Sequence, residues 1–399
     1  MKTLSFLYPV AIMLFILITS CATKKNVLDD FILKDPFLNQ IVKTPEYEVQ
    51  ILYTHVNLKD TTFRTYKYNI DNQRYFYPAS AVKMPVAVLA LQKKNELNRQ
   101  GIDLKITDHM LTAATRPTQT PAFIDTTTAS GKPNLERYIQ KIFAVSDDDA
   151  YNRLYEFLGQ DYINQSLKDK EIFTTSVICH RLNESGYSPE ENKHTNNVRF
   201  FRDKKVLYDK PEVYASKDWI HHASDAFKGI GYIDDHDSLI SGSFDFSRKN
   251  FYSMTDMEST IKRIIYPEKF TTGQRFDLTN DDYLFLRKCM SDLPGVYPFY
   301  RDYTMYYDSY VKYFIFGDNK SPMPEDIRIY NKNGNAYGYM IDCAYIENKQ
   351  KGIGFFLTAV IHVNKNQIYN DGKYEYNLVG LPFLSRLGRV IYDYELVNK

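Results

Sequence analysis

The sequence lacks an excess of charge of either sign: 50 lysine and arginine residues stand against 49 aspartate and glutamate residues. Proteins that follow a phosphate backbone need a basic surface, so nucleic acid is not an expected partner. Cysteine is scarce, with four residues and no C-x-x-C pair, which argues against a zinc site. Beyond the N-terminus no apolar run is long enough to cross a bilayer. The longest, Gly354 to Val363, is typical of a buried strand.

The N-terminus carries an export signal. Lys2 precedes an apolar run from Leu4 to Thr19, which is short for a membrane span and typical of a secretory signal. The run ends in L-I-T-S-C, which resembles a bacterial lipobox with Cys21 as the lipidated first residue of the mature protein. We therefore expect residues 1–20 to be a signal peptide. Lipid on Cys21 would hold the protein at a bacterial membrane, facing the periplasm or the cell exterior. The alternative is an uncleaved anchor helix, which would also export the chain.

The rest of the chain predicts one domain over residues 46–399, joined to the lipid by a charged tether over 21–45. Strands at both ends and helices between them favour a single sheet built from both ends of the chain. Residues 184–250 are polar with few clear periods, and we expect an irregular insertion there. The expected strands are 49–53 and 63–68, which form a hairpin, and 326–330, 337–346 and 354–363. The expected helices include 84–97, the helical region 135–168, 255–265, 281–290 and 382–396.

The first chemical motif is Ser80-Ala-Val-Lys83, which opens an alanine-rich apolar segment. Residues three apart share one helix face, so Lys83 should lie beside Ser80. A serine hydroxyl needs a base to become a nucleophile, and a lysine withdrawn from water can act as one. Pro85 is tolerated only in a first helical turn, which places Ser80 at the helix N-terminus. S-x-x-K alone is a weak signal, and Ser309–Lys312 is a second copy that we interpret as coincidence.

Two later motifs support a catalytic interpretation of the first motif. Ser146-Asp147-Asp148 opens a helical segment, and Lys332-Asn333-Gly334 stands at the start of a strand pattern. Each has an ordinary structural reading, a helix N-cap for the first and a turn for the second. The ordered set S-x-x-K, S-D-x and K-x-G resembles the active site of class A β-lactamases and penicillin-binding proteins. The D-D-A-Y-N continuation ending at Asn152 and the S-M-T-D-M run from Ser253 resemble further segments of the class A family.

This resemblance covers about residues 45 to 399 apart from the insertion. It implies an α+β fold with a five-stranded antiparallel sheet flanked by helices and an all-helical half. Ser80 would attack an acyl carbonyl, Lys83 would be the base or proton relay, and Ser146 would pass a proton to the leaving group. Lys332 would supply positive charge. The oxyanion hole would be the backbone N–H groups of Ser80 and Asn335. Asp148, Asn333, Gly334 and Asn335 would meet the substrate, and no cofactor is implied.

Three positions depart from the family pattern. Cys179 falls where the family has the glutamate that activates the deacylating water, with His180 and Glu184 as possible substitutes in a rearranged loop. Asp148 replaces an asparagine that donates to the substrate, and a carboxylate cannot donate. It would repel anionic substrates, become protonated or pair with Lys83. Asn333 replaces a threonine or serine. These changes argue for an altered substrate or a lost activity, and efficient turnover of penicillins is doubtful.

The leading hypothesis is a serine hydrolase that acts on an amide, ester or β-lactam outside the cytoplasm. Its substrate would be a small molecule or a peptidoglycan-like compound. One alternative is a D-alanyl-D-alanine carboxypeptidase or transpeptidase, which also lacks the deacylating glutamate. Another is an inactive lipoprotein that binds a ligand in the same cleft. The insertion holds His221, His222, His236 and several aspartates, but their spacing matches no ligand signature, so we expect no metal site.

Overall fold

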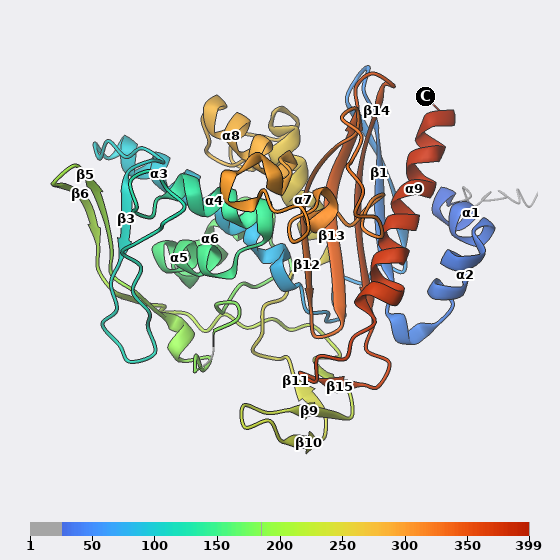
Figure 1. The fold of residues 1–399 in the computed structure, drawn as a ribbon, viewed down its shortest axis with the longest axis horizontal. Helices are drawn as coiled ribbons and strands as arrows, with labels where there is room; N and C mark the ends of the chain where they lie inside the picture. The colour runs from blue at the N-terminus through green and yellow to red at the C-terminus, as the bar shows by residue number, and fades with distance from the viewer. Residues whose placement is uncertain (1–25, 185, 399) are drawn as a thin grey trace, which may run out of the picture.

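The computed structural model describes residues 26–184 and 186–398, and its centre is a five-stranded antiparallel sheet (Figure 1). The expected lipobox with Cys21 lies outside the described residues. In sheet order the strands are β12 (Arg328–Ala336), β13 (Tyr339–Asn348), β14 (Ile353–His362), β1 (Gln50–Asn57) and β2 (Thr62–Tyr68). The two ends of the chain meet where β14 pairs with β1. The expected fold class and the expected hairpin of β1 and β2 are confirmed.

Strand β14 is buried along its whole length because helices cover both faces of the sheet. Successive side chains of a strand point to opposite faces. Phe356 and Val360 accordingly pack into the core on the helical side, whereas Phe355 and Leu357 pack into the core on the other side. The continuous apolar run of this strand in the sequence is explained because its side chains pack into a hydrophobic core on each face of the sheet.

One face of the sheet is covered by α9 (Leu381–Val397) together with α1 (Val27–Lys34) and α2 (Pro36–Val42), on the right in Figure 1. These first two helices correct the expected tether, because Leu28 and Leu38 are fully buried against the sheet. Asp35 connects the two helices. Its carboxylate accepts hydrogen bonds from the first turn of α2 and pairs with Arg386 of α9 at 2.6 Å. From residue 27 onward the chain is therefore part of the folded domain.

The other face carries the helical half. Its central helix is α3 (Lys83–Arg99), which is buried on nearly all sides; Pro85 sits in its first turn, as expected. Around it lie α4 (Leu135–Val145), α5 (Asp148–Leu158), α6 (Gln160–Asp169), α7 (Met254–Ile265) and α8 (Asn280–Ser291). Ser253 caps α7 by accepting from the backbone N–H of Asp256. The helices expected from periodicity and from the resemblance are thus present.

Residues 184–250 are more regular than expected, because they form strands too short to give a period in the sequence. Strands β5 (Val198–Arg202) and β6 (Lys205–Lys210) extend β3 (His109–Thr112) into a three-stranded sheet. Strand β9 (Gly231–Ile233) lies between β10 (Leu239–Ser241) and β15 (Ile368–Tyr369), and forms the lobe at the bottom of Figure 1. The remaining pairs are β4 (His194–Thr195) with β7 (Val213–Tyr214), and β8 (Phe227–Lys228) with β11 (Phe244–Asp245).

The three described cysteines, Cys179, Cys289 and Cys343, are buried and free. Over the residues that the structure describes, none of the helices has the length and apolar character needed to cross a membrane.

Candidate active site

Ser80 lies in a short 3₁₀ turn, Ala79–Val82, that leads directly into α3. The residue before it, Ala79, has a φ of 45°, a left-handed conformation that a residue with a Cβ rarely adopts. Backbone strain of this kind persists where the surrounding structure holds it in place, and it is concentrated at functional sites. The turn presents Ser80 between the N-terminus of α3 and the edge strand β12.

Strand β12 approaches the Ser80 turn so closely that only glycine fits. A Cβ on Gly334 would lie 2.6 Å from the backbone nitrogen of Ser80 and 3.1 Å from that of Ala81. The ordinary interpretation of Lys332–Gly334 as a turn is wrong, because the three residues lie within β12, opposite Cys343, Asp342 and Ile341 of β13. The glycine thus brings the backbone of β12, including the next residue Asn335, beside the backbone N–H of Ser80.

Lys83 points from the first turn of α3 toward the loop between α4 and α5. Its side chain is fully buried. Its Nζ donates to the backbone carbonyl of Ser146, lies 3.3 Å from the Ser146 hydroxyl and pairs with the Asp148 carboxylate at 2.6 Å. The sequence left three interpretations of Asp148 open, and the structure shows the one in which it pairs with Lys83. Burial lowers the pKa of Lys83, and the Asp148 carboxylate offsets part of that effect.

Lys332 reaches the same hydroxyl from β12. Its Nζ lies 2.9 Å from the Ser146 Oγ and also donates to the backbone carbonyl of Asn333 at 2.7 Å. Ser146 itself has a φ of 59° and closes the end of α4, which turns its hydroxyl between the two amines. Burial and the nearby Lys83 charge hold the pKa of Lys332 well below its usual range. A hydroxyl held between two buried amines of lowered pKa can pass a proton from one to the other.

The expected substrate-side residues of β12 have partners of their own. The amide oxygen of Asn333 accepts from Lys332 at 3.1 Å, so the residue that replaces threonine or serine orients the lysine. Asn335 is exposed, and its amide oxygen accepts from the Tyr313 hydroxyl at 2.7 Å. Sequence reasoning gave no role to Tyr313, because it lies in a tyrosine-rich stretch without a motif.

Cys179 is not placed to replace a catalytic glutamate. It packs with Val177 and Trp219 in a small separate cluster, and burial raises its pKa to about 12. A thiol that stays protonated in an apolar cluster is an inert structural group.

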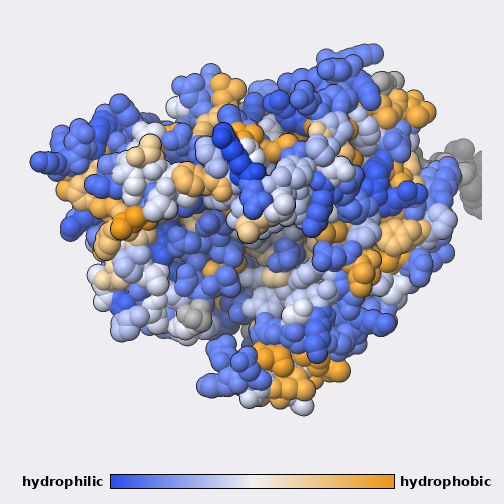
Figure 2. Space-filling view, in the orientation of Figure 1, coloured by the Kyte–Doolittle hydropathy of each residue, from blue (hydrophilic) through white to orange (hydrophobic). Residues whose placement is uncertain are grey.

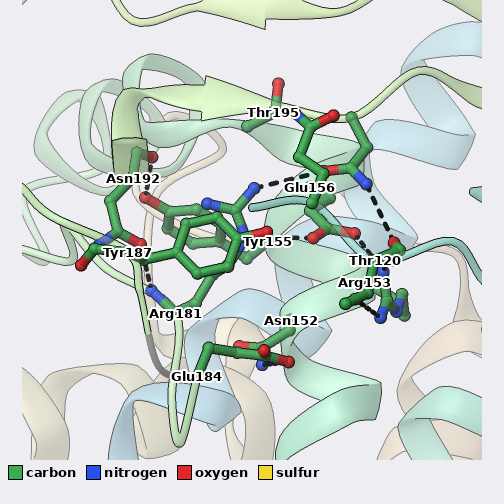
Figure 3. Close-up of polar contacts among 12 residues, drawn as sticks. Thr120, Asn152, Arg153, Tyr155, Glu156, Arg181, Glu184, Tyr187, Asn192 and Thr195 are labelled. Atoms are coloured by element: carbon green, nitrogen blue, oxygen red, sulfur yellow. Dashed lines mark hydrogen bonds and ion pairs between the residues drawn. The ribbon is translucent and has the colours of Figure 1, made fainter. Parts of the chain in front are cut away.

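Glu184 lies in the loop that follows Cys179. This loop places its carboxylate against α5, on the helical side of the site. Its Oε1 accepts from the Asn152 amide at 3.3 Å, and the two side chains meet at the lower edge of Figure 3. The same Asn152 amide holds the loop backbone by exchanging two hydrogen bonds of 2.9 Å with Leu182. Asn152 is one helical turn beyond Asp148, so Glu184 is anchored to the helix that also supplies the partner of Lys83. The sequence offered Glu184 only as one of two substitutes.

The loop is held against α5 by a buried network of charges (Figure 3). Glu156 is 1% exposed and pairs with Arg153 at 3.0 Å and with Arg181 at 3.1 Å. The Arg181 guanidinium lies over the rings of Tyr155 and Tyr187, at 5.3 and 4.3 Å from their centroids. A charge network with this many partners fixes the loop beside the site. Sequence reasoning missed it because its members lie up to 34 residues apart in the chain.

The second S-x-x-K copy, Ser309–Lys312, makes structural hydrogen bonds away from the site. The Ser309 hydroxyl donates to the Asn319 carbonyl at 2.5 Å. Lys312 is buried and donates to Asn331 at 2.7 Å and to the Met290 carbonyl. No group of three or more His, Cys, Asp or Glu able to hold a metal ion occurs in the described part of the chain.

The sheet, the helical half and the grouping of Lys83, Ser146 and Lys332 beside the Ser80 turn define a protein of the β-lactamase fold. Residues 36–201 match the model of the beta-lactamase enzyme family, which confirms the resemblance drawn from the motifs. No curated protein matches the sequence.

Solved structures of similar fold include a variant of the class A beta-lactamase of the last common ancestor of Gram-negative bacteria. It is 10% identical with a TM-score of 0.50, over 90% of this chain and 97% of that one. Another is a beta-lactamase from Xanthomonas campestris, 12% identical with a TM-score of 0.49, over 92% and 98% of the two chains. A third is a beta-lactamase from Desulfarculus baarsii, 10% identical with a TM-score of 0.49, over 89% and 94%.

Proposed function

We propose that the protein is a serine hydrolase that forms an acyl-enzyme on Ser80. The observation that carries the proposal is the hydroxyl of Ser146, which lies 3.3 Å from the Lys83 amine and 2.9 Å from the Lys332 amine beside the Ser80 turn. A serine with a purely structural role does not need two lysine amines beside its hydroxyl. Burying two amines next to each other costs free energy, which favours a catalytic role for the pair.

The proton movements follow from these contacts. The neutral Lys83 amine takes the proton of the Ser80 hydroxyl, and the oxygen bonds to the acyl carbon while the carbonyl electron pair moves onto its oxygen. The backbone N–H groups of Ser80 and Asn335 stabilise that oxyanion. When the intermediate collapses, the bond to the leaving group breaks. The proton then passes from Lys83 through the Ser146 hydroxyl to the leaving atom.

Lys332 and Asp148 have supporting roles in this scheme. Lys332 holds the Ser146 hydroxyl and supplies positive charge to an anionic substrate, while Asp148 stabilises Lys83 when it carries the proton. Hydrolysis also needs a base for the incoming water. Glu184 is the candidate for that base, because Asn152 holds its carboxylate and because Cys179 is buried elsewhere.

The substrate would be an amide, ester or β-lactam met outside the cytoplasm, with the protein held at the membrane by lipid on Cys21. A D-alanyl-D-alanine carboxypeptidase or transpeptidase is the second candidate. It is favoured by a cleft of about 730 Å³ beside the site, lined by Tyr77 and Tyr337, which has room for a peptide.

The test is covalent labelling of the full chain with a fluorophosphonate and with a fluorescent penicillin, against a Ser80→Ala variant of unchanged circular dichroism. We expect label on the wild type only. Digestion of muropeptides followed by mass spectrometry separates the two candidates, because only a peptidase releases terminal D-alanine. Ligand binding in Ser80→Ala without any adduct in the wild type would favour the inactive binding lipoprotein instead.

A further inference from the structure

The cleft beside the site is lined by more carboxylates than cationic side chains. It is walled by Tyr77 and Tyr337, whose rings meet edge to face at 4.8 Å between centroids. Tyr77 is three residues before Ser80, so their Cα atoms are at most about 11 Å apart. The face seen in Figure 2 is hollowed above the lobe of β9 and β10, and the residues around that hollow are largely hydrophilic. The cleft thus joins the nucleophile turn to the lobe that residues 184–250 add.

Five carboxylates line this cleft, from Glu184, Asp234, Asp235, Asp237 and Asp245. Two of its three cations are neutralised outside it, because Arg181 pairs with Glu156 at 3.1 Å and Arg248 pairs with Asp218 at 2.9 Å. The third, Lys249, remains in the cleft, 5.9 Å from the ring centroid of Tyr337, and its charge helps to lower the pKa of His180. Among the described residues, the cleft therefore keeps a clear excess of negative charge.

Two of these carboxylates are held in place by the backbone. Asp234 accepts from the backbone N–H groups of His236 and Ser238, both at 2.9 Å. Asp245 accepts from the N–H of Ser247 at 2.7 Å. Fixed carboxylates lose less side-chain entropy on binding a cation than free ones do.

His180 supplies an independent sign of a ligand. Its ring lies in the cleft wall, stacked on Tyr77, and the residue is 9% exposed. Its Nδ1 donates to the Arg181 carbonyl, which leaves Nε2 as an acceptor, and Nε2 has no hydrogen-bond partner within the described chain. Burial lowers the pKa of His180 to about 3, so the ring stays neutral at physiological pH. A buried acceptor without a donor is costly and calls for a ligand N–H group.

We propose that this cleft binds an ammonium group on the acyl portion of the substrate, with His180 and the carboxylates of Asp234 and Asp245 as acceptors. This inference rests on the proposed function, since it names the substrate class of that same site. The acyl side is specified because neither Ser146 nor Lys332, which face the leaving group, lines the cleft.

The test compares two penicillins that differ by one ammonium group, α-aminobenzylpenicillin and benzylpenicillin. Their dissociation constants are measured by calorimetry with the Ser80→Ala variant of the full chain, so that binding is read without acylation. We expect the amine-bearing compound to bind about tenfold more tightly at low salt. The preference should shrink as salt screens the carboxylates.

Matched variants test whether the carboxylates and His180 cause this preference. Asp234→Asn combined with Asp245→Asn should remove most of the preference, whereas Asp203→Asn in an exposed turn outside the cleft should keep it. His180→Phe should reduce the preference without altering its dependence on salt, because it removes an acceptor and no charge. Equal affinity for the two compounds, or a preference that survives the double substitution, overturns the proposal. Failure of the proposed function is distinct: it would show as no adduct on the wild type while this preference persists.

Discussion

Replacing Asp148 by asparagine tests how Lys83 is tuned. The two side chains are 2.6 Å apart, and Lys83 is buried whereas the Asp148 side chain is 37% exposed. At that distance the attraction is about 1.6 kcal/mol in water and about 6 kcal/mol at an effective dielectric constant of about 20. Solvent screening at the half-exposed carboxylate brings the figure to about 2 kcal/mol, which corresponds to about 1.5 pH units.

The sign follows from the mechanism. Asp148 raises the pKa of Lys83, opposing the effect of burial, so its removal should lower that pKa. Lys83 acts as a base only when neutral, and the acidic limb of the acylation rate against pH reports its pKa. We therefore expect Asp148→Asn to move that limb to lower pH by about 1.5 units, with faster acylation below the wild-type midpoint.

The assay is the second-order rate constant for labelling by a neutral fluorophosphonate, measured from acid to alkaline pH for both proteins. Asp149→Asn is the matched control, because this carboxylate is next on the same helix, is 58% exposed and pairs with Arg153 instead. An acidic limb that stays in place in Asp148→Asn, or moves to higher pH, would refute Lys83 as the base.

Three further outcomes are expected. Gly334→Ala should slow acylation by about 10²-fold, since the added Cβ would collide with the Ser80 backbone; Gly295→Ala, where the Cβ meets open space, should not. Glu156→Gln should lower the free energy of unfolding by about 3–5 kcal/mol in denaturant titrations, because the buried Arg181 loses its counter-ion and Arg153 keeps only the exposed Asp149. Burial lowers the pKa of Lys312 from 10.5 to about 7, so the unfolded chain binds the extra proton between those values. Stability from this group then rises with pH across that window, and Lys312→Met should flatten the rise.

The sheet and the helices of the domain could be predicted because each buried element leaves a period or an apolar run. Strand β14 and helix α3 are the clearest examples, being buried on nearly all sides. The helices at 27–42 were missed because they are short and their charged residues hide a few fully buried leucines and isoleucines. Their stability comes from tertiary packing, which a local pattern does not report.

The site could be predicted only in part. The motifs identified Ser80, Lys83, Ser146 and Lys332 as a set, and the structure brings the last three around one hydroxyl. The loop that carries Glu184 could not be placed, because its position depends on Asn152 and on the ion pairs of Glu156. Such contacts join residues that are far apart in the sequence, and their spacing follows no rule.

The most direct measurement is the intact mass of the full chain after exposure to a small panel of lactams and esters, followed by peptide mapping of any adduct. We predict one added acyl group located on Ser80, absent from Ser80→Ala and strongly reduced in Lys83→Met. An adduct on another residue, or the same adduct in Ser80→Ala, would contradict it.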